Sequence, residues 1–550
     1  MSLLYQQFVE ETFGPHGEVT KFRVKPLEQF NFAYDVVDRL AAEQPAKLAM
    51  QWCNEAGDER RFTFADMARE SDRAAAWFLS LGIRRGDAVM LILKRHFEFW
   101  FCILALHKIG AVAVPATNQL MEKDLVYRFN AARIKAVVCT AEGQISELVD
   151  SAQAKTDTVT TKVMVRGRRD GWLSFEDGMA ADLPFMKPAD LPGVRDLMLM
   201  YFSSGTTGMP KMVAHNYLYP LGHVPTAVYW QDVDPNGLHL TVSETGWAKS
   251  MWGKLYGQWL AEAAIFTYDF DRFNAEELLN CIVKYHITTF CAPPTIYRFL
   301  IKQDLSRFDL SSLKHTVIAG EALNPEVFNQ FKKHTGLKLM EGYGQTEMTL
   351  SVGTLKWMQP KPGSMGKPSP AYDVQIVDEA GNPMNTGEIG EIVIRTAEYT
   401  PVGMLMEYLY DEDMTRRAWH DGLFHTGDTA WMDEDGYIWY VGRMDDIIKS
   451  SGYRIGPFEV ESVIMEHPAV MECAVTGVPD PVRGQIVKAT VVLAKGYTAS
   501  DLLAKELQEY VKTHTAPYKY PRQVEFVPEL PKTISGKIRR TEIRQKDSEK

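Results

Sequence analysis

The feature that most constrains the fold is a repeated alternation of short apolar runs with helical stretches. GDAVMLIL (86–93) is typical of a strand, a helix is expected through about Lys108, and the strand AVAVP follows. The segments KDLVYRFNAARIKAVVCT and AEELLNCIVKYHITTFCAPP repeat this pattern. Apolar strands between helices are typical of a parallel sheet whose two faces are covered by helices. An α/β structure is therefore predicted for the chain up to about residue 370.

After about residue 370 the pattern changes. YDVQIVDEAG, GEIGEIVIR and DGYIWYVGR are short strands separated by Gly and Asp turns. After GRMDD the chain resumes with the strands MECAVTG and VKATVVLA, the helix SDLLAKELQEYVKTHT and the strand RQVEFV. These last elements predict a compact α+β unit of about 105 residues, from Asp446 to Lys550.

Composition and charge exclude several classes of protein. The formal net charge is −11 and no basic patch stands out, which argues against a nucleic-acid partner. The six cysteines form no C-x-x-C pair, so neither a zinc site nor a disulfide framework is expected, and a reduced, cytoplasmic setting fits best. No targeting segment is visible at the N-terminus. The most apolar run, FWFCILALHKIGAVAVP, is interrupted by His107 and Lys108 and is too short to span a bilayer.

A Gly/Ser/Thr-rich stretch, YFSSGTTGMPKMVAH (201–215), is the first candidate for chemistry. Backbone N–H groups and hydroxyls of such a loop can surround phosphate oxygens, and Lys211 adds a positive charge. The loop is not a Walker A motif, because Gly208 is followed by Met209 and Lys211 by Met212. A magnesium ligand must then come from elsewhere. The alternative interpretation is a flexible surface turn.

Three later stretches contain groups that such a loop would need. EGYGQTEMT (341–349) places Thr346 beside Glu347, and a hydroxyl next to a carboxylate can hold a phosphate together with Mg²⁺. Asp428 and Arg443 flank a short predicted hairpin, so both can face one ribose. LPKTISGKIRR places Lys537 on a glycine-containing loop among other cations. The plain alternatives are a hairpin-turn carboxylate, a solvated arginine and a solvated basic tail.

Together and in this order, these stretches resemble those of the adenylate-forming superfamily of acyl-CoA synthetases, luciferases and peptide-synthetase adenylation domains. The resemblance covers nearly all of the chain from about residue 30. Within the superfamily, SSGTTGMPK, YGQTE, GRMDDIIKSSGYRIGPFEVE, DPVRGQ, TAPYKYPR and LPKTISGKIRR are most similar to the medium-chain acyl-CoA synthetases.

The resemblance implies both a reaction and an architecture. The carboxylate of an acid attacks the α-phosphate of ATP to give an acyl-adenylate and pyrophosphate, and the thiol of coenzyme A then displaces AMP, with Mg²⁺ as cofactor. Residues 1–442 are implied to form a large domain of α/β subdomains plus a distorted β-barrel. Residues 443–550 are implied to form a small, mobile α+β domain, with a hinge near 443–446.

The resemblance also assigns the ATP side residue by residue. Thr346 and Arg454 are implied at the α-phosphate, and Glu347 is implied as the Mg²⁺ ligand. Lys537 is implied to reach the α-phosphate and acyl oxygens during adenylation, where it offsets developing charge, and Asp445 is implied as the hinge. The other implied ATP-binding residues are Ser203, Ser204, Gly205, Thr206, Thr207, Gly208, Lys211, Gly320, Glu321, Ala322, Glu341, Gly342, Tyr343, Gly344, Gln345, Asp428 and Arg443.

In this superfamily the small domain rotates between the two half-reactions and presents another face for thioester formation. Gly452 fits this role, because a pantetheine arm that passes close to the backbone leaves no room for a Cβ. For each cation on that face, a solvated surface charge is the alternative. The implied CoA-side residues are Gln119, Ser451, Gly452, Tyr453, Arg483, Lys512, Tyr520, Pro521 and Arg522.

The acyl pocket is inferred from one difference within the superfamily. Acetyl-specific relatives carry Trp in place of Gly344, so glycine is expected to leave depth for a longer or bulkier acid. Indole rings would narrow that space and favour a compact, branched acid, although core packing is the alternative role for each tryptophan. Burial would disfavour the charge of Lys249 unless a carboxylate pairs with it. The candidate pocket residues are Trp230, Trp247, Lys249, Trp252, Cys291 and Gly344.

Three functions from different classes fit these observations. The first is an AMP-forming acyl-CoA synthetase for a short- to medium-chain acid, branched and aromatic acids included. The second is an adenylation enzyme that loads a carrier protein, which Arg483 and Arg522 on the CoA side argue against. The third is a nucleotide- or acyl-binding protein without turnover, which the presence of Lys537, Glu347 and Thr346 argues against.

Overall fold

Helices and strands alternate through the first part of the chain, as the sequence pattern predicts. The computed structural model describes residues 2–203, 209–321, 323–451, 453–533 and 537–548. The apolar run near residue 100 forms strand β5 (Ala88–Ile92), helix α3 (Glu98–Ile109) and strand β6 (Val112–Pro115), all of them buried. Gly110 ends α3 with a φ of 75°, a left-handed conformation that glycine adopts without steric cost.

The first large sheet has eight strands in the order β21-β11-β10-β6-β5-β7-β8-β9. The pairings from β10 to β9 are parallel, while β11 and β21 add an antiparallel edge. That edge brings residues near 211 and near 408 together. The other strands of this sheet are β7 (Ile134–Thr140), β8 (Thr161–Val165), β9 (Leu173–Ser174), β10 (Leu197–Ser203), β11 (Lys211–Asn216) and β21 (Glu407–Tyr408).

The second large sheet has nine strands in the order β18-β17-β16-β15-β14-β12-β13-β3-β4. The pairings from β16 to β3 are parallel; β17 and β18 continue the sheet with antiparallel pairings on one side, and β4 does so on the other. Its strands are β3 (Leu48–Asn54), β4 (Glu59–Thr63), β12 (Leu238–Thr241), β13 (Ala264–Asp269), β14 (Thr289–Ala292), β15 (His315–Ala319), β16 (Leu339–Gln345), β17 (Met348–Gly353) and β18 (Lys367–Pro368).

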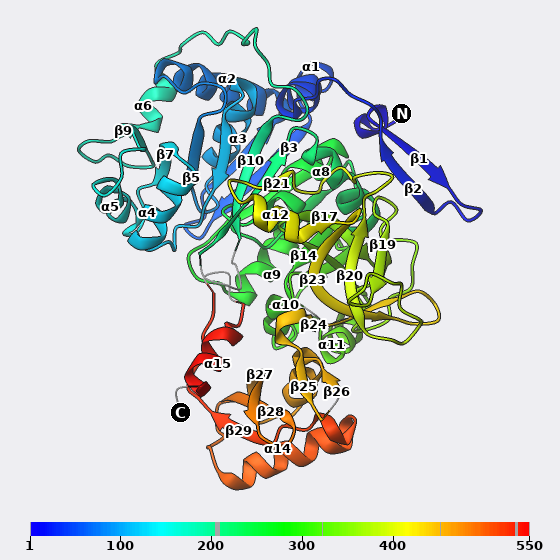
Figure 1. Ribbon diagram of the computed structural model, residues 1–550. Helices are drawn as coiled ribbons and strands as arrows, with labels where there is room; N and C mark the ends of the chain where they lie inside the picture. The colour runs from blue at the N-terminus through cyan, green and yellow to red at the C-terminus, as the bar shows by residue number, and fades with distance from the viewer. Residues whose placement is uncertain (1, 204–208, 322, 452, 534–536, 549–550) are drawn as a thin grey trace.

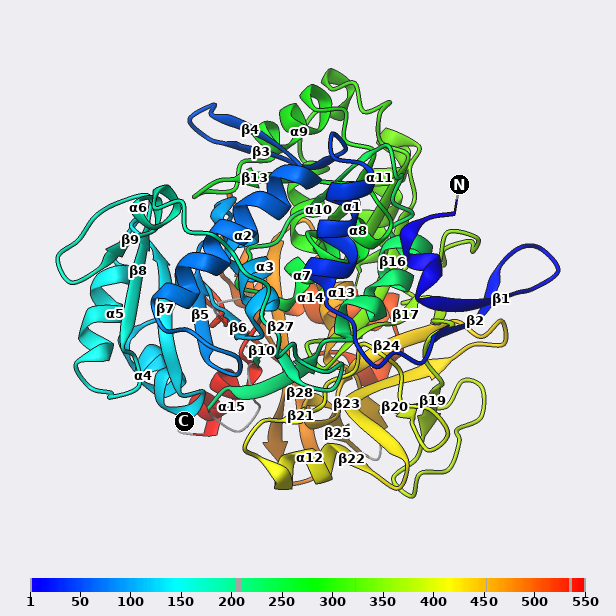
Figure 2. The same ribbon diagram turned by 90° about the horizontal axis from the view of Figure 1, so that it is seen from above.

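The largest hydrophobic core lies between these two sheets. Helix α3 contacts β5 and β6 of the first sheet, and α2 (Phe64–Ser80) contacts both α3 and strands β3 and β4 of the second (Figure 2). Val89, Leu199, Ile265 and Met340 show that both sheets contribute side chains to this core. The other helices of the region are α1 (Arg39–Glu43), α4 (Glu122–Ala131), α5 (Ile145–Gln153), α6 (Phe175–Ala180), α7 (Ala248–Gly253), α8 (Tyr256–Leu260), α9 (Ala275–Lys284), α10 (Pro294–Leu300), α11 (Pro325–Thr335) and α12 (Glu412–Ala418).

A third, antiparallel sheet follows where the sequence pattern changes. Its strands are β19 (Val374–Val377), β20 (Gly390–Arg395), β22 (Trp419–His420), β23 (Leu423–Met432) and β24 (Ile438–Arg443). In the described residues the order β19-β20-β23-β22, with β24 beside β23, does not return on itself to close a barrel. A separate hairpin of β1 (Val9–Phe13) and β2 (Val19–Val24) lies near the N-terminus.

The C-terminal region forms a smaller α+β unit with a core of its own (Figure 1). Its sheet has the order β26-β25-β28-β27, with β29 parallel to β28. The predicted mixed α/β fold, with a large N-terminal and a small C-terminal domain, is confirmed. The elements of this unit are β25 (Ile448–Ser450), β26 (Tyr453–Ile455), α13 (Pro457–Met465), β27 (Val470–Asp480), β28 (Gly484–Leu493), α14 (Asp501–His514), β29 (Gln523–Phe526) and α15 (Arg540–Ser548).

The small domain extends one segment back to the large domain. Figure 1 shows the chain that precedes α15 running from the small domain up to the large one. The two regions also meet where α13 packs against β24, and the Asn324 side-chain amide donates to the carbonyl of Ser462 at 3.2 Å. Among the described residues, no helix combines the length and the apolarity needed to cross a membrane.

Candidate active site

The predicted Thr346–Glu347 turn joins strands β16 and β17, and it brings a carboxylate next to the phosphate-loop lysine. Glu347 is buried, and its Oε1 accepts a hydrogen bond from the Tyr408 hydroxyl at 2.9 Å. The Lys211 ammonium lies 5.1 Å from the centre of the Tyr408 ring. Burial, followed by the charge of Glu347, raises the pKa of Tyr408, so this hydroxyl stays protonated and donates. Tyr408 is a site residue that sequence reasoning missed, because a tyrosine in a two-residue strand has no distinctive pattern.

Asp428 and Arg443 lie directly opposite each other on β23 and β24, as the predicted hairpin requires. Asp428 is 5% exposed, and its Oδ2 accepts from the Tyr343 hydroxyl and from the Gln345 amide, both at 2.6 Å. Its Oδ1 accepts from the Tyr440 hydroxyl at 3.2 Å and lies 3.3 Å from Arg443 Nη1. A carboxylate held by this many donors presents a fixed anionic acceptor, which suits the recognition of paired hydroxyls.

Charge and burial both shift the pKa values of the groups around Asp428. Burial alone would lower the pKa of Arg443, but the adjacent Asp428 carboxylate raises it, so Arg443 is a permanent cation here. Burial and the same carboxylate raise the pKa of Tyr440. Asp428, Arg443, Tyr343 and Gln345 were all predicted as ATP-binding residues, and Tyr440, which lies on β24, was missed.

The predicted ATP-binding segment that begins at Gly320 follows strand β15 at the carboxyl end of the second sheet. Gly320 has a φ of 108°, and Gly342 on β16 pairs with Ala319 in register. Carboxyl ends of parallel strands are the usual ligand-binding edge of an α/β sheet. The Glu321 carboxylate accepts from the Thr295 hydroxyl at 3.2 Å. Burial raises the pKa of Glu341, also on β16, to about 8, even though the Leu323 amide donates to its carboxylate.

The charge of Lys537, in the small domain, acts on Lys249 of the large domain. Burial is the main reason why the pKa of Lys249 is lowered; Lys537 lowers it further, while Cys291 and Glu321 raise it. These four groups are therefore close enough to interact electrostatically. Lys537 is held by its own loop, because its amide donates to the Thr533 hydroxyl at 3.0 Å and its carbonyl accepts from the Thr533 amide at 2.7 Å.

Two other predicted residues of the small-domain boundary stay apart from this cluster. Arg454 lies on β26, and its exposed guanidinium pairs with Glu379 at 2.8 Å. Asp445 lies in the short turn Met444–Asp446, 3.8 Å from Arg443 Nε. The role of Arg454 at the α-phosphate and the hinge role of Asp445 stay predictions.

Part of the predicted phosphate and CoA machinery lies outside the described residues. Ser203 ends β10 and pairs in register with Lys211, the first residue of β11, so the phosphate loop connects two neighbouring antiparallel strands. The predicted residues outside the described ranges are Ser204, Gly205, Thr206, Thr207, Gly208, Ala322 and Gly452.

One group of predicted CoA-side residues lies between β25 and β26 and at the start of β28. The Arg483 guanidinium donates to the Ser451 hydroxyl at 3.1 Å, and the Ser451 amide donates to the Arg483 carbonyl at 2.9 Å. The exposed ring of Tyr453 stacks on Tyr518 at 4.1 Å.

A second group lies at the end of α14 and the start of β29. Lys512 and Arg522 lie 4.6 Å and 4.7 Å from the centre of the Tyr520 ring, and Arg522 also donates to the Tyr520 hydroxyl at 2.6 Å. Pro521 beside them is buried. Gln119 is not part of either group, because it lies in the large domain. There its backbone N–H donates to the Thr117 hydroxyl at 3.2 Å.

Gly344 lies against Trp252, one of the predicted pocket tryptophans. Trp230 and Trp252 meet edge to face, with ring centres 6.2 Å apart. A Cβ added at Gly344 would lie 2.5 Å from the Trp252 ring and 2.5 Å from the Thr349 carbonyl oxygen. The glycine therefore makes room for the Trp252 indole of this chain, and the role of Gly344 in leaving depth for an acid stays a prediction.

The other predicted pocket residues gather near β14 and α7. Cys291 lies on β14 in a buried position, and burial raises the pKa of its thiol, which keeps it neutral. The Lys249 ammonium donates to the Ala319 carbonyl. Trp247 is half-buried and immediately precedes α7.

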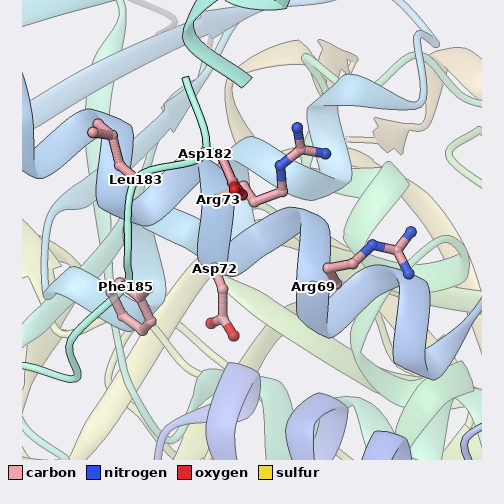
Figure 3. A pocket seen from close by; sticks show the side chains of 6 residues that line it. All are labelled: Arg69, Asp72, Arg73, Asp182, Leu183 and Phe185. Atoms are coloured by element: carbon pink, nitrogen blue, oxygen red, sulfur yellow. The ribbon is translucent and has the colours of Figure 1, made fainter. Parts of the chain in front are cut away.

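A surface pocket of about 400 Å³ lies away from all these residues, between α2 and the loop that follows α6 (Figure 3). Its two arginines are already paired, because Arg69 binds Asp66 at 2.9 Å and Arg73 binds Glu70 at 3.0 Å. It is therefore not an anion site. Its lining residues are Arg69, Asp72, Arg73, Asp182, Leu183 and Phe185.

Comparison with known proteins agrees with this geometry. The family model described as AMP-binding enzyme matches residues 37–409, and that described as AMP-binding enzyme C-terminal domain matches residues 459–537. The chain therefore belongs to the family of AMP-binding enzymes, and the predicted resemblance to the adenylate-forming superfamily is confirmed.

Individual relatives span the whole chain. It is 41% identical to the acyl-coenzyme A synthetase ACSM3, mitochondrial, of Mus musculus, over 100% of this chain and 96% of the relative. It is 43% identical to the acyl-coenzyme A synthetase ACSM4, mitochondrial, of Rattus norvegicus, over 95% and 92%. Among solved structures, the anthranilate CoA ligase AuaEII in complex with anthranoyl-AMP is 29% identical, with a TM-score of 0.87 over 95% of this chain and 98% of that one.

Proposed function

We propose that this protein is an ATP-dependent, AMP-forming acyl-CoA synthetase. It activates a short- to medium-chain carboxylic acid, branched and aromatic acids included, as an acyl-adenylate and transfers the acyl group to coenzyme A. The observation that carries this proposal is geometric: the Asp428 carboxylate is held opposite Arg443 by several donors, and the Glu347 carboxylate is held by Tyr408, whose ring lies beside Lys211. Acyl-coenzyme A synthetases as full-length relatives support the same reaction.

In the first half-reaction an acid carboxylate oxygen attacks the α-phosphorus of ATP, and the bond to pyrophosphate breaks. Asp428 binds the ribose hydroxyls, and Arg443 holds the Asp428 carboxylate in position. Lys211 and the phosphate loop bind the departing pyrophosphate. Lys537 offsets the charge that develops on the α-phosphate and acyl oxygens, a role that is strongest in a site arranged before the reaction.

Glu347 is the residue proposed to hold Mg²⁺. Carboxylate oxygens suit this ion, and the hydrogen bond from Tyr408 fixes the orientation of the Glu347 carboxylate. When bound, Mg²⁺ would neutralise charge on the phosphate oxygens. Thr346, next to Glu347, is proposed to contact the α-phosphate.

In the second half-reaction the sulfur of CoA attacks the acyl carbonyl carbon, AMP leaves, and the thiol proton is lost to solvent. We propose that residues 443–550 rotate about Asp445 between the two steps. The Ser451–Arg483 and Lys512–Tyr520–Arg522 groups would then face CoA, whose phosphates suit the exposed cations. Arg454 would exchange Glu379 for a phosphate.

A cytoplasmic location and a role in fatty-acid metabolism complete the proposal. All six cysteines are free and buried, which suits a reducing compartment. The curated relatives carry the word mitochondrial in their names, so a fractionation of the source cells is the direct check on the compartment.

The test is a pair of assays on purified protein with linear, branched and aromatic acids of two to ten carbons. Pyrophosphate exchange that depends on the acid, together with AMP release that depends on CoA, is expected. Exchange without CoA-dependent AMP release would favour an adenylation enzyme that loads a carrier protein. Absence of exchange with every acid would favour a binding protein without turnover.

A further inference from the structure

A series of buried aromatic side chains, each in contact with the next, begins at the Thr346–Glu347 turn. His215 on β11 and His223, in the short helical turn Tyr219–His223, both have no solvent-exposed surface. Sequence reasoning assigned neither histidine a role. His215 belongs to the strand that follows the phosphate loop, and the His223 ring contacts Trp252, one of the tryptophans of the proposed acyl pocket.

His215 contacts the turn directly. Its Nε2 lies 2.9 Å from the carbonyl oxygen of Thr346, and because a carbonyl can only accept, Nε2 carries the proton and donates. Burial lowers the pKa of His215 to about 4, so the ring is neutral near pH 7 and has a single N–H to give. That N–H is directed at the peptide group between the two residues proposed to bind phosphate and Mg²⁺.

The turn is also held from its other side. The Leu405 amide donates to the carbonyl of Glu347 at 2.7 Å, and Tyr408 of the same segment orients the Glu347 side chain. The backbone bond from Leu405 survives any side-chain change there. The bond to Thr346 comes from a side chain, so a substitution at His215 can remove it selectively.

The His215 ring is itself fixed by a series of ring contacts. It lies on Tyr219 at 3.9 Å between ring centres, and Tyr219 meets His223 edge to face at 4.7 Å. His223 in turn lies 6.4 Å from Trp252, the indole that fills the space beside Gly344. These contacts connect the wall of the proposed acyl pocket with the phosphate-binding turn.

We propose that His215 is a positioning residue for adenylation, which holds Thr346 and Glu347 in place through the Thr346 carbonyl and is itself held by Tyr219, His223 and Trp252. This inference rests on the proposed function. It assigns the histidine no contact with ATP or with the acid; its effect on the reaction passes through the turn.

The experiment compares two substitutions that differ in one hydrogen bond. His215→Phe keeps a ring on Tyr219 but removes the donor, whereas His215→Gln keeps an N–H at a similar reach. Small displacements of reacting groups can cost up to about 100-fold in rate. We therefore expect His215→Phe to lower kcat for acid-dependent pyrophosphate exchange by about 10- to 100-fold, with the KM for the acid changed less than kcat, and His215→Gln to restore most of the loss.

His107→Phe is the matched control. This ring is also fully buried, and it loses a hydrogen bond of similar length, 2.9 Å to the Tyr256 hydroxyl, but it does not contact the turn. A comparable fall in thermal stability with near-normal exchange is expected. Equal losses of kcat in both Phe variants, or a His215→Phe enzyme with normal kcat, would overturn the proposal. If His215→Phe does not fold, His215→Asn replaces it, because its amide is too short to reach Thr346.

A second readout does not depend on the reaction. Hydrogen–deuterium exchange of the peptide that spans residues 341–353 should become faster in His215→Phe and return toward the parent in His215→Gln. Faster amide exchange in a protein that shows no acid-dependent pyrophosphate exchange would leave the structural role of His215 intact and reject the proposed function. Unchanged amide exchange would reject the role of His215.

Discussion

Asp428 and Lys537 are both assigned to the nucleotide, but the molecule holds them in different ways. Asp428 is 5% exposed and receives hydrogen bonds from Tyr343, Gln345 and Tyr440 within one domain. Lys537 is exposed and belongs to the other domain, where its loop is closed by Thr533. The proposed ribose site is thus built into one domain, whereas the proposed catalytic lysine is supplied by a loop of the other.

The largest effect is expected from Lys537→Ala. Removing one preorganised donor costs roughly 10²- to 10³-fold in rate, so acid-dependent pyrophosphate exchange should fall by about that factor. Conversion of a supplied acyl-adenylate with CoA should stay near normal, because the rotated domain withdraws the lysine. Similar damage to both half-reactions would show that the lysine is not withdrawn between them.

Asp428→Asn is expected to weaken ATP binding by about 10- to 100-fold, because hydrogen bonds to a charged group contribute roughly 1.5–3 kcal/mol. The substitution keeps the shape of the side chain but removes the charge that also pairs with Arg443. Calorimetric titration with ATP measures the loss, and thermal unfolding checks that the sheet is intact. Unchanged ATP affinity would remove Asp428 from the ribose site.

Asp445→Pro tests whether the small domain, which carries Lys537, moves relative to the large domain. Proline fixes φ and removes a backbone donor, so one domain orientation should be frozen. Because the charge of Lys537 acts on Lys249 in this orientation of the two domains, pyrophosphate exchange should persist while overall thioester formation falls by at least about tenfold. Asp445→Ala is the control and should keep both activities. Full turnover in the proline variant would contradict the hinge.

Gly344→Ala tests the packing of Trp252 against strand β16, which carries Gly344. The added Cβ would lie 2.5 Å from the indole, and overpacking of this kind typically costs about 1–3 kcal/mol. Gly344 is not among the residues of positive φ, so the cost comes from packing and not from backbone strain. A lower Tm and a shift in acid preference are expected. A Tm equal to that of the parent would mean that the indole moves freely.

The smallest effect concerns the buried carboxyl of Glu341. Its pKa rises from an ordinary value of 4.5 to about 8 in the folded protein. The folded state therefore binds more protons than the unfolded state between these values, and this contribution to stability is lost as the pH rises from about 4.5 to about 8. Glu341→Gln should flatten the fall of Tm over that range. An identical pH profile would show that Glu341 is ionised in the folded protein.

Local pattern predicted much of this molecule correctly. The apolar runs near residues 90 and 113 are buried strands, Gly110 ends the helix between them, and Asp428 faces Arg443 across a hairpin. Each of these features depends on residues close together in the chain, where backbone geometry and hydrophobic period leave few alternatives.

The contacts that sequence reasoning missed depend on side chains from distant segments. Tyr408 reaches Glu347 across 61 positions and His215 reaches Thr346 across 131, and neither has a local signature. Gly344 shows the same limit, because the sequence does not tell which neighbour lies against a missing side chain. Trp252, 92 positions earlier in the sequence, lies against it here. Strand identity and hairpin register follow from neighbouring residues, but the occupancy of a pocket depends on the close packing of the whole core, in which every volume is set by its neighbours.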